Sequence, residues 1–365
     1  MLKFLNLQPE VFGIDVNDFS LKIIKLKKSL KGFDVVSFNN YPLKPGIVKE
    51  GIILDKSALV KAITSACLSV KGQKLQTKYA VVSLPEEKSF SRVIQMPKMA
   101  KEDLVSAVPF EAENYIPIAI DKVYLDFQEI ESSKHHGGHC DLLINVLPKS
   151  IIDPYVYCFK QAGLVPLALE VESQSIARAL LKNGSSDSPL IILDLGQDST
   201  GFSIFSGNSI RFTCSLPGFS RQLTQAISDK LGVGFSRAED LKVKYGLSQK
   251  AGNKYNIEKI IQPMLRELIV QIKKYIEFYQ SHSSFEYFSS DTKIEKMILC
   301  GGGANLKNLP DFLSKNLGMS VEIGNPFINN IYQKKSAVRI SNQDALSLAT
   351  ALGLALRGAS GEFEI

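Results

Sequence analysis

The chain has 365 residues, of which 45% are hydrophobic and 22% are charged, a composition typical of a soluble globular protein with room for two or more domains. The 43 Lys and Arg residues against 37 Asp and Glu give a net charge of +6, but no aromatic residues interleave with the lysines at 22–31. We therefore expect a solvated strand face and turn there, and no nucleic acid as a partner. No run approaches the ~18 apolar residues of a membrane helix, and the first ten residues hold too short an apolar stretch for a signal peptide, so direct membrane insertion is not expected. Five cysteines, an odd number without a C-x-x-C pair, indicate reduced thiols in a cytoplasmic protein.

Residues 1–85 predict the core of a first lobe, with strands near 11–16, 20–26 and 32–39 and a helix near 56–70. Between the first two strands, Asp15 ends an apolar run, Asn17 lies in a tight turn, and Ser20 and Lys22 follow. Such a turn leaves backbone N–H groups that point the same way and can bind phosphate. Because a bare carboxylate would repel phosphate, we expect Asp15 to hold Mg²⁺ through water. We assign all four residues to a nucleotide site.

Residues 86–165 predict a small inserted subdomain of strand, helix, strand and strand, at about 91–97, 101–115, 122–130 and 140–147. A return helix to the first lobe and a linker are expected over 166–189. Because the helix of the insert ends beside a strand edge, we expect a groove there that takes a short apolar peptide from a membrane partner. The side chains expected to line this groove are Phe110, Glu113, Tyr115 and Ile116.

The strand-turn-strand pattern returns at the start of a second lobe, predicted over 190–365. Asp194 ends an apolar run, Gly196 lies in the turn, and Ser199 and Thr200 supply hydroxyl groups. Asp15 and Asp194 are too distant in the chain for a single hairpin, so the repeat predicts two similar lobes placed face to face. We expect a phosphate tail clamped between them, with both aspartates holding Mg²⁺ through water.

A helical subdomain is predicted over about 218–295, and in it Glu239 and Lys242 lie three residues apart on one helix face. We expect Glu239 to bind ribose hydroxyl groups and the stem of Lys242 to cover the base. A buried strand at 296–300 then runs into a glycine-rich turn, which would let a nucleoside lie directly on the backbone. The residues of this turn assigned to the nucleotide site are Gly301, Gly302, Gly303 and Asn305.

These four elements in this order resemble the actin-like ATPase superfamily, which implies an α/β protein of two lobes with the ribonuclease H-like fold. Within it, the chain is similar to the PilM family of type IV pilus assembly proteins, which is related to the division protein FtsA. The similarity runs over nearly the whole length and is carried by the stretches 41–48, 51–53, 110–117, 162–166, 325–327 and 351–358.

The resemblance implies a cytoplasmic scaffold, peripheral to the inner membrane, that binds ATP and Mg²⁺ and is at most a slow ATPase. It also implies that a groove between the first-lobe core and the insert receives the cytoplasmic N-terminal peptide of a PilN-like membrane protein. Such a scaffold would connect the assembly platform of a pilus, or of a related type II secretion system, to its motor ATPases. We identify no water-activating residue in the sequence.

The first hairpin departs from the family pattern Asp-x-Gly-Ser-Ser-Ser at three positions. Asn17 replaces the glycine and is expected to accept the positive φ of the turn. Asp18 is expected to place a negative charge beside a phosphate, and Phe19 replaces a small donor with a bulky ring. Both changes should weaken nucleotide binding unless a cation intervenes.

Two other functions are compatible with the same fold. A small-molecule kinase would present a carboxylate to its substrate hydroxyl group. The aspartates of the insert, Asp121 and Asp126, are the candidates, but they lie at a strand edge without a Gly-rich loop. An FtsA-like filament protein would be tethered by a C-terminal amphipathic helix, whereas the segment 360–365 is short and acidic and would be repelled by an anionic membrane.

Overall fold

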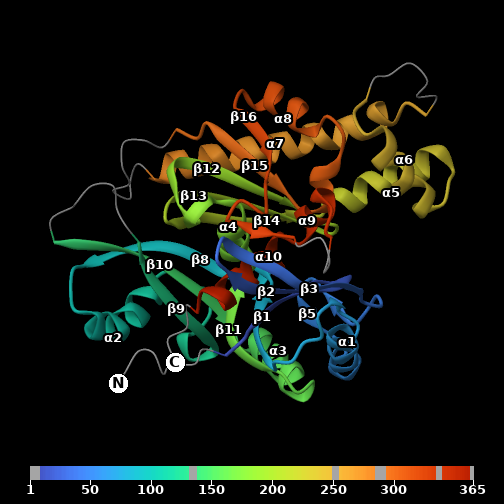
Figure 1. Ribbon diagram of the computed structural model, residues 1–365. Coiled ribbons are helices and arrows are strands. Elements are labelled where there is room, and N and C mark those ends of the chain that lie inside the picture. Colours follow the sequence, from blue (N-terminus) through green and yellow to red (C-terminus); the bar gives the residue numbers. More distant parts are fainter. Residues whose placement is uncertain (1–8, 131–137, 249–254, 284–292, 334–338, 362–365) are drawn as a thin grey trace.

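The computed structural model describes residues 9–130, 138–248, 255–283, 293–333 and 339–361, and it arranges them as two lobes and a small insert (Figure 1). Each lobe is built on one sheet. The strand order is β11-β7-β1-β2-β3-β17 in the first lobe, with β6 paired to β3, and β14-β13-β12-β15-β16 in the second. The strands of the first-lobe sheet are β1 (Phe12–Val16), β2 (Ser20–Ser29), β3 (Gly32–Pro42), β6 (Lys71–Gly72), β7 (Tyr79–Leu84), β11 (Val165–Val171) and β17 (Ile331–Tyr332). Those of the second are β12 (Ser186–Leu195), β13 (Ser199–Gly207), β14 (Ser209–Pro217), β15 (Lys296–Cys300) and β16 (Ser320–Ile323).

The two lobes repeat one three-strand unit. β1 pairs antiparallel with β2 and parallel with β7, and β12 pairs antiparallel with β13 and parallel with β15. Asp15 lies opposite Lys22 in the first unit, and Asp194 lies opposite Gly201 in the second. The duplicated hairpins that the sequence predicted are therefore present, and both aspartates stand near the ends of central strands.

Two pairs of helices cover the first-lobe sheet. Ile23 and Ile24 are consecutive in β2 and so point to opposite faces. Ile23 packs with the buried side chains of α1 (Lys56–Leu68) and α3 (Lys149–Gln161), while Ile24 packs with those of α4 (Glu172–Leu180) and α10 (Ala349–Ser360). α1 begins where the carboxylate of Asp55 accepts a hydrogen bond of 2.9 Å from the N–H of Ala58. Shorter elements of this lobe are β4 (Val48–Lys49), β5 (Ile52–Ile53), η4 (Lys182–Gly184) and α9 (Asn342–Ser347).

The insert is a three-stranded antiparallel sheet with one covering helix, at the lower left of Figure 1. Its strand order is β8-β10-β9, so β8 and β9 are both edge strands. Apolar side chains of α2, among them Leu104 and Val108, pack on Ile94 and Leu142 of this sheet. The elements are η2 (Glu86–Lys88), β8 (Phe90–Pro97), α2 (Lys101–Ala112), η3 (Ile120–Lys122), β9 (Val123–Ile130) and β10 (His139–Pro148).

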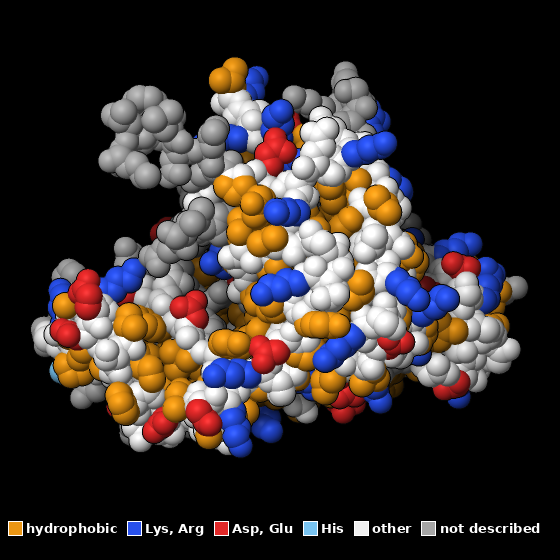
Figure 2. Space-filling view, turned by 90° about the horizontal axis from the view of Figure 1, so that it is seen from below, with side chains coloured by type: hydrophobic (Ala, Val, Ile, Leu, Met, Phe, Trp, Pro, Cys, Tyr) orange, Lys and Arg blue, Asp and Glu red, His pale blue; other side chains and the backbone are white. Residues whose placement is uncertain are grey.

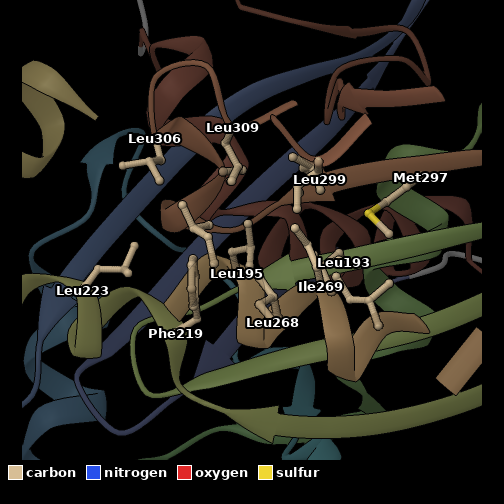
Figure 3. Close-up of a cluster of buried hydrophobic side chains, with 14 of the residues drawn as sticks. Leu193, Leu195, Phe219, Leu223, Leu268, Ile269, Met297, Leu299, Leu306 and Leu309 are labelled. Carbon is tan, nitrogen blue, oxygen red and sulfur yellow. The ribbon is translucent and has the colours of Figure 1, made fainter. Parts of the chain in front are cut away.

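The second lobe has its main core between its sheet and the helices that follow the hairpins. Figure 3 shows side chains of β12 and β15 pointing toward those of α5 (Phe219–Leu231) and α7 (Ile257–Ser283), with Leu306 and Leu309 closing one side. The other elements are α6 (Phe235–Tyr245), η5 (Gly302–Asn305) and α8 (Leu309–Leu317).

The packing corrects two of the expected domain boundaries. α3 lies within the segment 86–165 that was assigned to the insert, but it packs with α1 on the first-lobe sheet, so the sheet of the insert ends with β10. β17 and α10 lie within the segment 190–365 that was assigned to the second lobe, but β17 pairs with β3 and α10 packs across β1 and β2. The lobe to which α3, β17 and α10 belong is decided by contacts between segments far apart in the chain, which local sequence patterns do not predict.

Candidate functional site

Two adjoining cavities lie between the elements that end in the predicted motifs. The larger has a volume of about 1500 Å³ and is lined by both hairpins, and the smaller, of about 440 Å³, lies between α5, α6 and the glycine-rich turn. Gly196, Gln197, Arg221 and Gly302 line both, so the two cavities meet at these residues. The arrangement gives one cleft with a polar arm between the lobes and a smaller arm in the second lobe.

Asp15 is held rigidly at the end of β1. Its side chain is only 2% exposed, its Oδ1 accepts a hydrogen bond of 2.9 Å from the hydroxyl of Ser83, and its Oδ2 lies 3.3 Å from the Lys22 Nζ. The same Ser83 hydroxyl accepts a bond of 2.9 Å from the N–H of Val16. Asp15 and Lys22 are therefore in contact, and they present one carboxylate and one ammonium group to the larger cavity.

The turn of the first hairpin is closed by the side chain of Asn17. Its Oδ1 accepts from the N–H of Phe19 at 3.0 Å, the N–H of Ser20 at 2.9 Å and the hydroxyl of Ser20 at 3.2 Å. The turn forms with Asn17 in place of glycine, and it does so without a positive φ at Asn17, which is not among the residues of positive φ in the described chain. The side-chain oxygen of Asn17 accepts the hydrogen bonds that these groups were expected to donate to a phosphate oxygen.

Asp18 and Phe19 also differ from the expectation. The carboxylate of Asp18 accepts from the N–H groups of Glu50 at 2.6 Å and Gly51 at 3.2 Å, so its charge is held by another turn of the first lobe. The ring of Phe19 lies under the guanidinium of Arg221, which is 5.6 Å from the ring centroid. Neither side chain is simply an obstacle in the phosphate turn.

Arg221 connects the two lobes where the two cavities meet. It comes from α5 of the second lobe, and its guanidinium lies 5.6 Å from the ring of Phe235 as well as 5.6 Å from that of Phe19. Its Nε is 3.8 Å from the Oδ1 of Asp198, in the turn of the second hairpin. Sequence reasoning missed this residue, because an isolated Arg at the start of a helix carries no local signal of a contact across a cleft.

The second hairpin places Asp194 beside the glycine-rich turn. Burial raises the pKa of Asp194, Asp15 raises it further, and Lys22 opposes the rise. Gly301 has φ of 78°, and a Cβ at this position would lie 2.4 Å from the Asp194 Oδ1. The close approach requires a glycine there and leaves the carboxylate against bare backbone.

The turn of the second hairpin is also shaped by glycine. A Cβ at Gly196 would lie 2.6 Å from the carbonyl oxygen of Ser199, so the turn is tighter than a side chain would allow. Ser199, which the sequence assigned to the nucleotide site, lines the larger cavity. The assignment of Thr200 is corrected, because its side chain is fully buried and it lines neither of the two cavities.

The smaller cavity contains the predicted nucleoside residues Glu239, Lys242, Gly302, Gly303 and Asn305. The ammonium of Lys242 is buried and lies 2.8 Å from Glu239 Oε2, 2.9 Å from the hydroxyl of Ser220 and 2.8 Å from that of Thr224. Thr224 also donates to Glu239. Burial lowers the pKa of Lys242, and the hydrogen bond and charge of Glu239 oppose that shift. Lys242 therefore fixes the half-exposed Glu239 carboxylate in place, a role different from covering a base.

Asn305 braces the glycine-rich turn. Its Nδ2 donates to the carbonyl oxygens of Gly302 at 3.3 Å and Gln343 at 3.1 Å, which ties η5 to α9. Gly302 has open space where a Cβ would be, and a Cβ at Gly303 would lie 2.9 Å from that of Leu195. The turn thus presents Gly302 to the cavities while Gly303 packs against β12.

Glu172 is a site residue that the sequence analysis missed. It is the first residue of α4, it lines the larger cavity, and burial raises its pKa well above the ordinary value, with Asp15 and Asp194 as the next causes. The available signal was its position directly after the apolar strand 165–171, which parallels the placement of Asp15 and Asp194 after their strands. Three carboxyl groups therefore share this part of the cleft, with Lys22 as a neighbouring cation.

The carboxyl groups fit a magnesium ion bound through water better than one bound directly. Among the described residues, no group of three or more His, Cys, Asp or Glu side chains has a geometry that would hold a metal ion. Asp15 is already engaged by Ser83 and Lys22, and Asp194 lies against Gly301. The cavity that Asp15 and Asp194 line has a volume of about 1500 Å³, which is enough for a hydrated ion and a phosphate chain.

The four residues predicted for a peptide groove lie on the insert. Phe110 is 76% exposed and Glu113 is exposed at the end of α2, whereas Ile116 is buried in the core of the insert. Tyr115 donates a hydrogen bond of 3.0 Å to Glu111, and the guanidinium of Arg92 lies 4.4 Å from its ring centroid. None of the four lines either of the two cavities described above. Their assignment to one groove wall is corrected for Ile116, which is a core residue.

The sequence matches the protein family described as "Type IV pilus assembly protein PilM" over residues 13–359. A cell division protein FtsA from Enterococcus hirae is 22% identical over 85% of this chain and 77% of its own length. The fold is similar to a chain in a PilM-PilN type IV pilus biogenesis complex, with a TM-score of 0.80, 25% identity and coverage of 97% of this chain and 99% of that one. It also resembles MreB 5 of Spiroplasma citri bound to AMPPNP, with a TM-score of 0.54, 11% identity and 95% coverage of both chains, a likeness of fold alone. No helix among the described residues is long and apolar enough to cross a membrane.

Proposed function

Because this chain belongs to the PilM family of type IV pilus assembly proteins, we propose that it is a nucleotide-binding scaffold of the inner-membrane platform that assembles such pili or a related secretion system. The nucleotide is ATP, and the partner is the cytoplasmic N-terminal peptide of a PilN-like membrane protein. Through that partner the scaffold stands beside the membrane and connects the platform to motor ATPases.

The observation that carries nucleotide binding is the junction of the two cavities at Gly196, Arg221 and Gly302. The larger cavity presents the polar side chains of Asp15, Lys22 and Asp194. It continues into the smaller cavity, which presents the Glu239 carboxylate and the backbone of Gly302. A phosphate chain followed by a nucleoside has groups that suit these two surfaces in the same order. The nucleotide-bound MreB 5 relative of the same fold is consistent with this use of the cleft.

In this proposal each residue has a separate task. Lys22 and the N–H groups of the second hairpin bind phosphate oxygens, and Glu239, held by Lys242, accepts hydrogen bonds from ribose hydroxyl groups. Asp15 and Asp194 would hold a hydrated Mg²⁺, which offsets the negative charge of the phosphates. Glu172 is the carboxyl group placed to orient or deprotonate a water molecule, and its raised pKa makes the protonated form more populated than in a solvated glutamate. Hydrolysis should therefore be slow.

Calorimetry with ATP and Mg²⁺ tests the proposal. Wild-type protein should bind ATP, and Asp194→Asn should weaken binding about ten-fold, which corresponds to roughly 1.4 kcal/mol. Asp121→Asn, a change of an exposed carboxyl group outside both cavities, is the matched control and should bind like wild type. Absence of heat and of a thermal shift at millimolar nucleotide would exclude ATP as the ligand. The same control addresses the kinase alternative, because a kinase that used Asp121 would lose its activity in that variant.

The partner peptide is proposed to bind on the insert, at the exposed end of α2. Phe110 and Ile118 are exposed apolar side chains there, and Tyr124 is exposed on the edge strand β9. Figure 2 shows apolar side chains gathered on the left of the view, the side on which Figure 1 places α2. An aromatic anchor beside an unpaired strand edge suits a short extended peptide, which can add backbone hydrogen bonds to the strand.

A pull-down with a synthetic N-terminal peptide of a PilN-like protein tests this binding. The variant with Phe110→Ala and Glu113→Lys should retain less peptide than wild type at an unchanged melting temperature, since both side chains are exposed. Leu68→Ala, at another exposed apolar position that lies at the end of α1, is the control and should retain the peptide. Equal retention by the double variant would place the contact elsewhere.

A further inference from the structure

The turn between β2 and β3 exposes an isolated leucine among lysines. Ser29 pairs with Gly32, so Leu30 and Lys31 form a two-residue loop. Leu30 is 107% exposed, the most exposed large apolar side chain among the described residues. Lys28 and Lys31 are exposed on either side of it. The lysine pattern predicted a solvated face, but solvation gives no reason for a leucine at the tip.

The backbone of this turn is braced, so Leu30 is held away from the protein. The N–H of Phe33 donates to the carbonyl oxygen of Asn330 at 2.9 Å, and the hydroxyl of Ser29 donates to the carbonyl oxygen of Gly32 at 3.3 Å. Gly32 has φ of 145°, and a Cβ there would lie 2.3 Å from the Asn330 carbonyl oxygen. The neighbouring segment thus supports the base of the turn and leaves its tip free to project.

The charge around the tip has one sign. Between Phe19 and Phe33 the sequence contains five lysines and no Asp or Glu, and the next carboxyl group, Asp34, is buried. Lys27 lies opposite Asp34 in the β2–β3 register, whereas Lys28 and Lys31 lie opposite no acidic residue. The tip therefore presents uncompensated positive charge around an apolar side chain.

The tip is also remote from the nucleotide cleft. β2 begins at Ser20 in the larger cavity and runs for ten residues to Ser29, which is about 30 Å at the rise of an antiparallel strand. Neither of the two cavities is lined by a residue of the turn. A contact made by the tip leaves the cleft accessible.

We infer that the β2–β3 turn contacts the surface of an anionic bilayer, with Leu30 in the interface and Lys28 and Lys31 at the headgroups. Long lysine side chains can keep their ammonium groups at phosphate level while an apolar neighbour enters the interface. A single projecting leucine without a surrounding apolar patch suits a fluid lipid surface better than a protein, whose binding sites need a larger packed core. The contact is independent of nucleotide and of the proposed partner peptide.

The contact is weak by itself and serves to orient the protein. Each lysine near an anionic surface increases binding roughly five-fold, so two lysines contribute on the order of a 25-fold increase. The apolar side chain of Leu30 adds a further several-fold increase, and stable anchoring generally takes two signals. The turn would act as the second signal for a protein already tethered through a membrane partner.

Co-sedimentation of the full chain with vesicles tests the inference. Wild type should sediment with vesicles that contain phosphatidylglycerol, should not sediment with phosphatidylcholine alone, and should be released by salt. Leu30→Ser should reduce the bound fraction several-fold, and Lys28→Glu with Lys31→Glu should abolish binding. All three residues are exposed, so unchanged melting temperatures will show that the variants are folded.

Two matched variants and one competitor complete the experiment. Leu68→Ser changes another leucine, 82% exposed, and Lys273→Glu with Lys274→Glu reverses an exposed lysine pair on α7; both should bind vesicles like wild type. Inorganic phosphate at equal ionic strength should not compete more than chloride does. Equal loss in the control and turn variants, or full competition by phosphate, or no binding to anionic vesicles at all, would overturn the inference.

Discussion

At the scale of single residues, the ionised form of a carboxyl group in the cleft lowers the stability of the folded chain. Glu172 lines the larger cavity with Asp15 and Asp194, and its pKa is raised well above the ordinary value, first by partial burial and then by these two charges. A carboxyl group whose pKa is higher in the folded chain than in the unfolded chain takes up protons on folding. Its contribution to stability is therefore lost as pH rises from the ordinary glutamate pKa through the raised one.

We predict that Glu172→Gln raises the melting temperature at neutral pH by roughly 2 °C, because it removes a carboxylate that partial burial and two neighbouring carboxyl groups disfavour and keeps the shape of the side chain. It should also flatten the loss of stability between acidic and neutral pH, and it should reduce any ATP hydrolysis. Thermal melts across this pH range check the first two effects, with Glu277→Gln, an exposed glutamate of α7, as control. A lower melting temperature in Glu172→Gln would show that the carboxylate is paired in the folded protein.

A second prediction concerns the turn that Asn17 closes. Asn17→Gly removes the oxygen that accepts from the N–H groups of Phe19 and Ser20, and glycine is tolerated in a tight turn. The freed donors should bind phosphate, so affinity for ATP should rise several-fold in calorimetry. Adenosine has no phosphate and should bind the variant and wild type alike, which makes it the internal control. Unchanged or weaker ATP binding would mean that phosphate does not reach the first hairpin.

At the scale of elements, α10 depends on glycines where it crosses its neighbours. A Cβ at Gly353 would lie 1.8 Å from the carbonyl oxygen of Ser175 in α4, and one at Gly13 would lie 2.5 Å from the carbonyl oxygen of Ala351. Both contacts are with backbone, which cannot move aside without displacing an element. α10 is also fixed by an ion pair of 3.1 Å between Arg357 and the buried Glu170. This helix is part of the first-lobe core and is unavailable as a surface tether of the FtsA-like kind.

We predict that Gly353→Ala lowers the free energy of unfolding by about 2–3 kcal/mol, the usual cost of overpacking a closely packed interior. Urea denaturation measures this. Gly234→Ala is the control, because a Cβ there meets nothing within 4 Å and Gly234 has a negative φ of −62°. Equal stability of the two variants would show that α4 and α10 can separate without loss.

The elements that the sequence predicted are those with a local signal. The hairpins around Asn17 and Gly196 and the strand that ends at Cys300 were predicted because alternating apolar residues and turn residues are adjacent in the chain. The packing of α3 and α10 on the first-lobe sheet was not predicted, because the apolar residues of a helix do not indicate which sheet the helix covers. At the site, Asp15 and Asp194 could be predicted from their repeat, whereas Arg221 and Glu172 act through residues far away in the chain.

At the scale of the whole molecule, a cation–π contact crosses the cleft between the lobes. Phe19 belongs to the first lobe, Arg221 and Phe235 belong to the second, and the guanidinium lies at the same distance of 5.6 Å from both rings. Asp198 holds the guanidinium from the side at 3.8 Å. Phe19, which departs from the small residue of the family pattern, thus gains a partner on the opposite lobe. Arg221 lines both cavities, Phe19 lines the larger and Phe235 the smaller, so the contact stands at their junction.

The last prediction is that the Phe19–Arg221 contact slows nucleotide release by holding the lobes together. A cation–π pair at an exposed site contributes about 0.5–1 kcal/mol, so Phe19→Leu should speed the dissociation of a fluorescent ATP analogue roughly two- to five-fold. Arg221→Gln alone has a mixed effect, because it also removes a positive charge near the phosphates. The informative measurement is therefore the double-mutant cycle in stopped-flow dissociation. If the two residues act through one contact, Phe19→Leu will have little further effect in the Arg221→Gln background, whereas fully additive effects would show that the lobes are held together by other contacts.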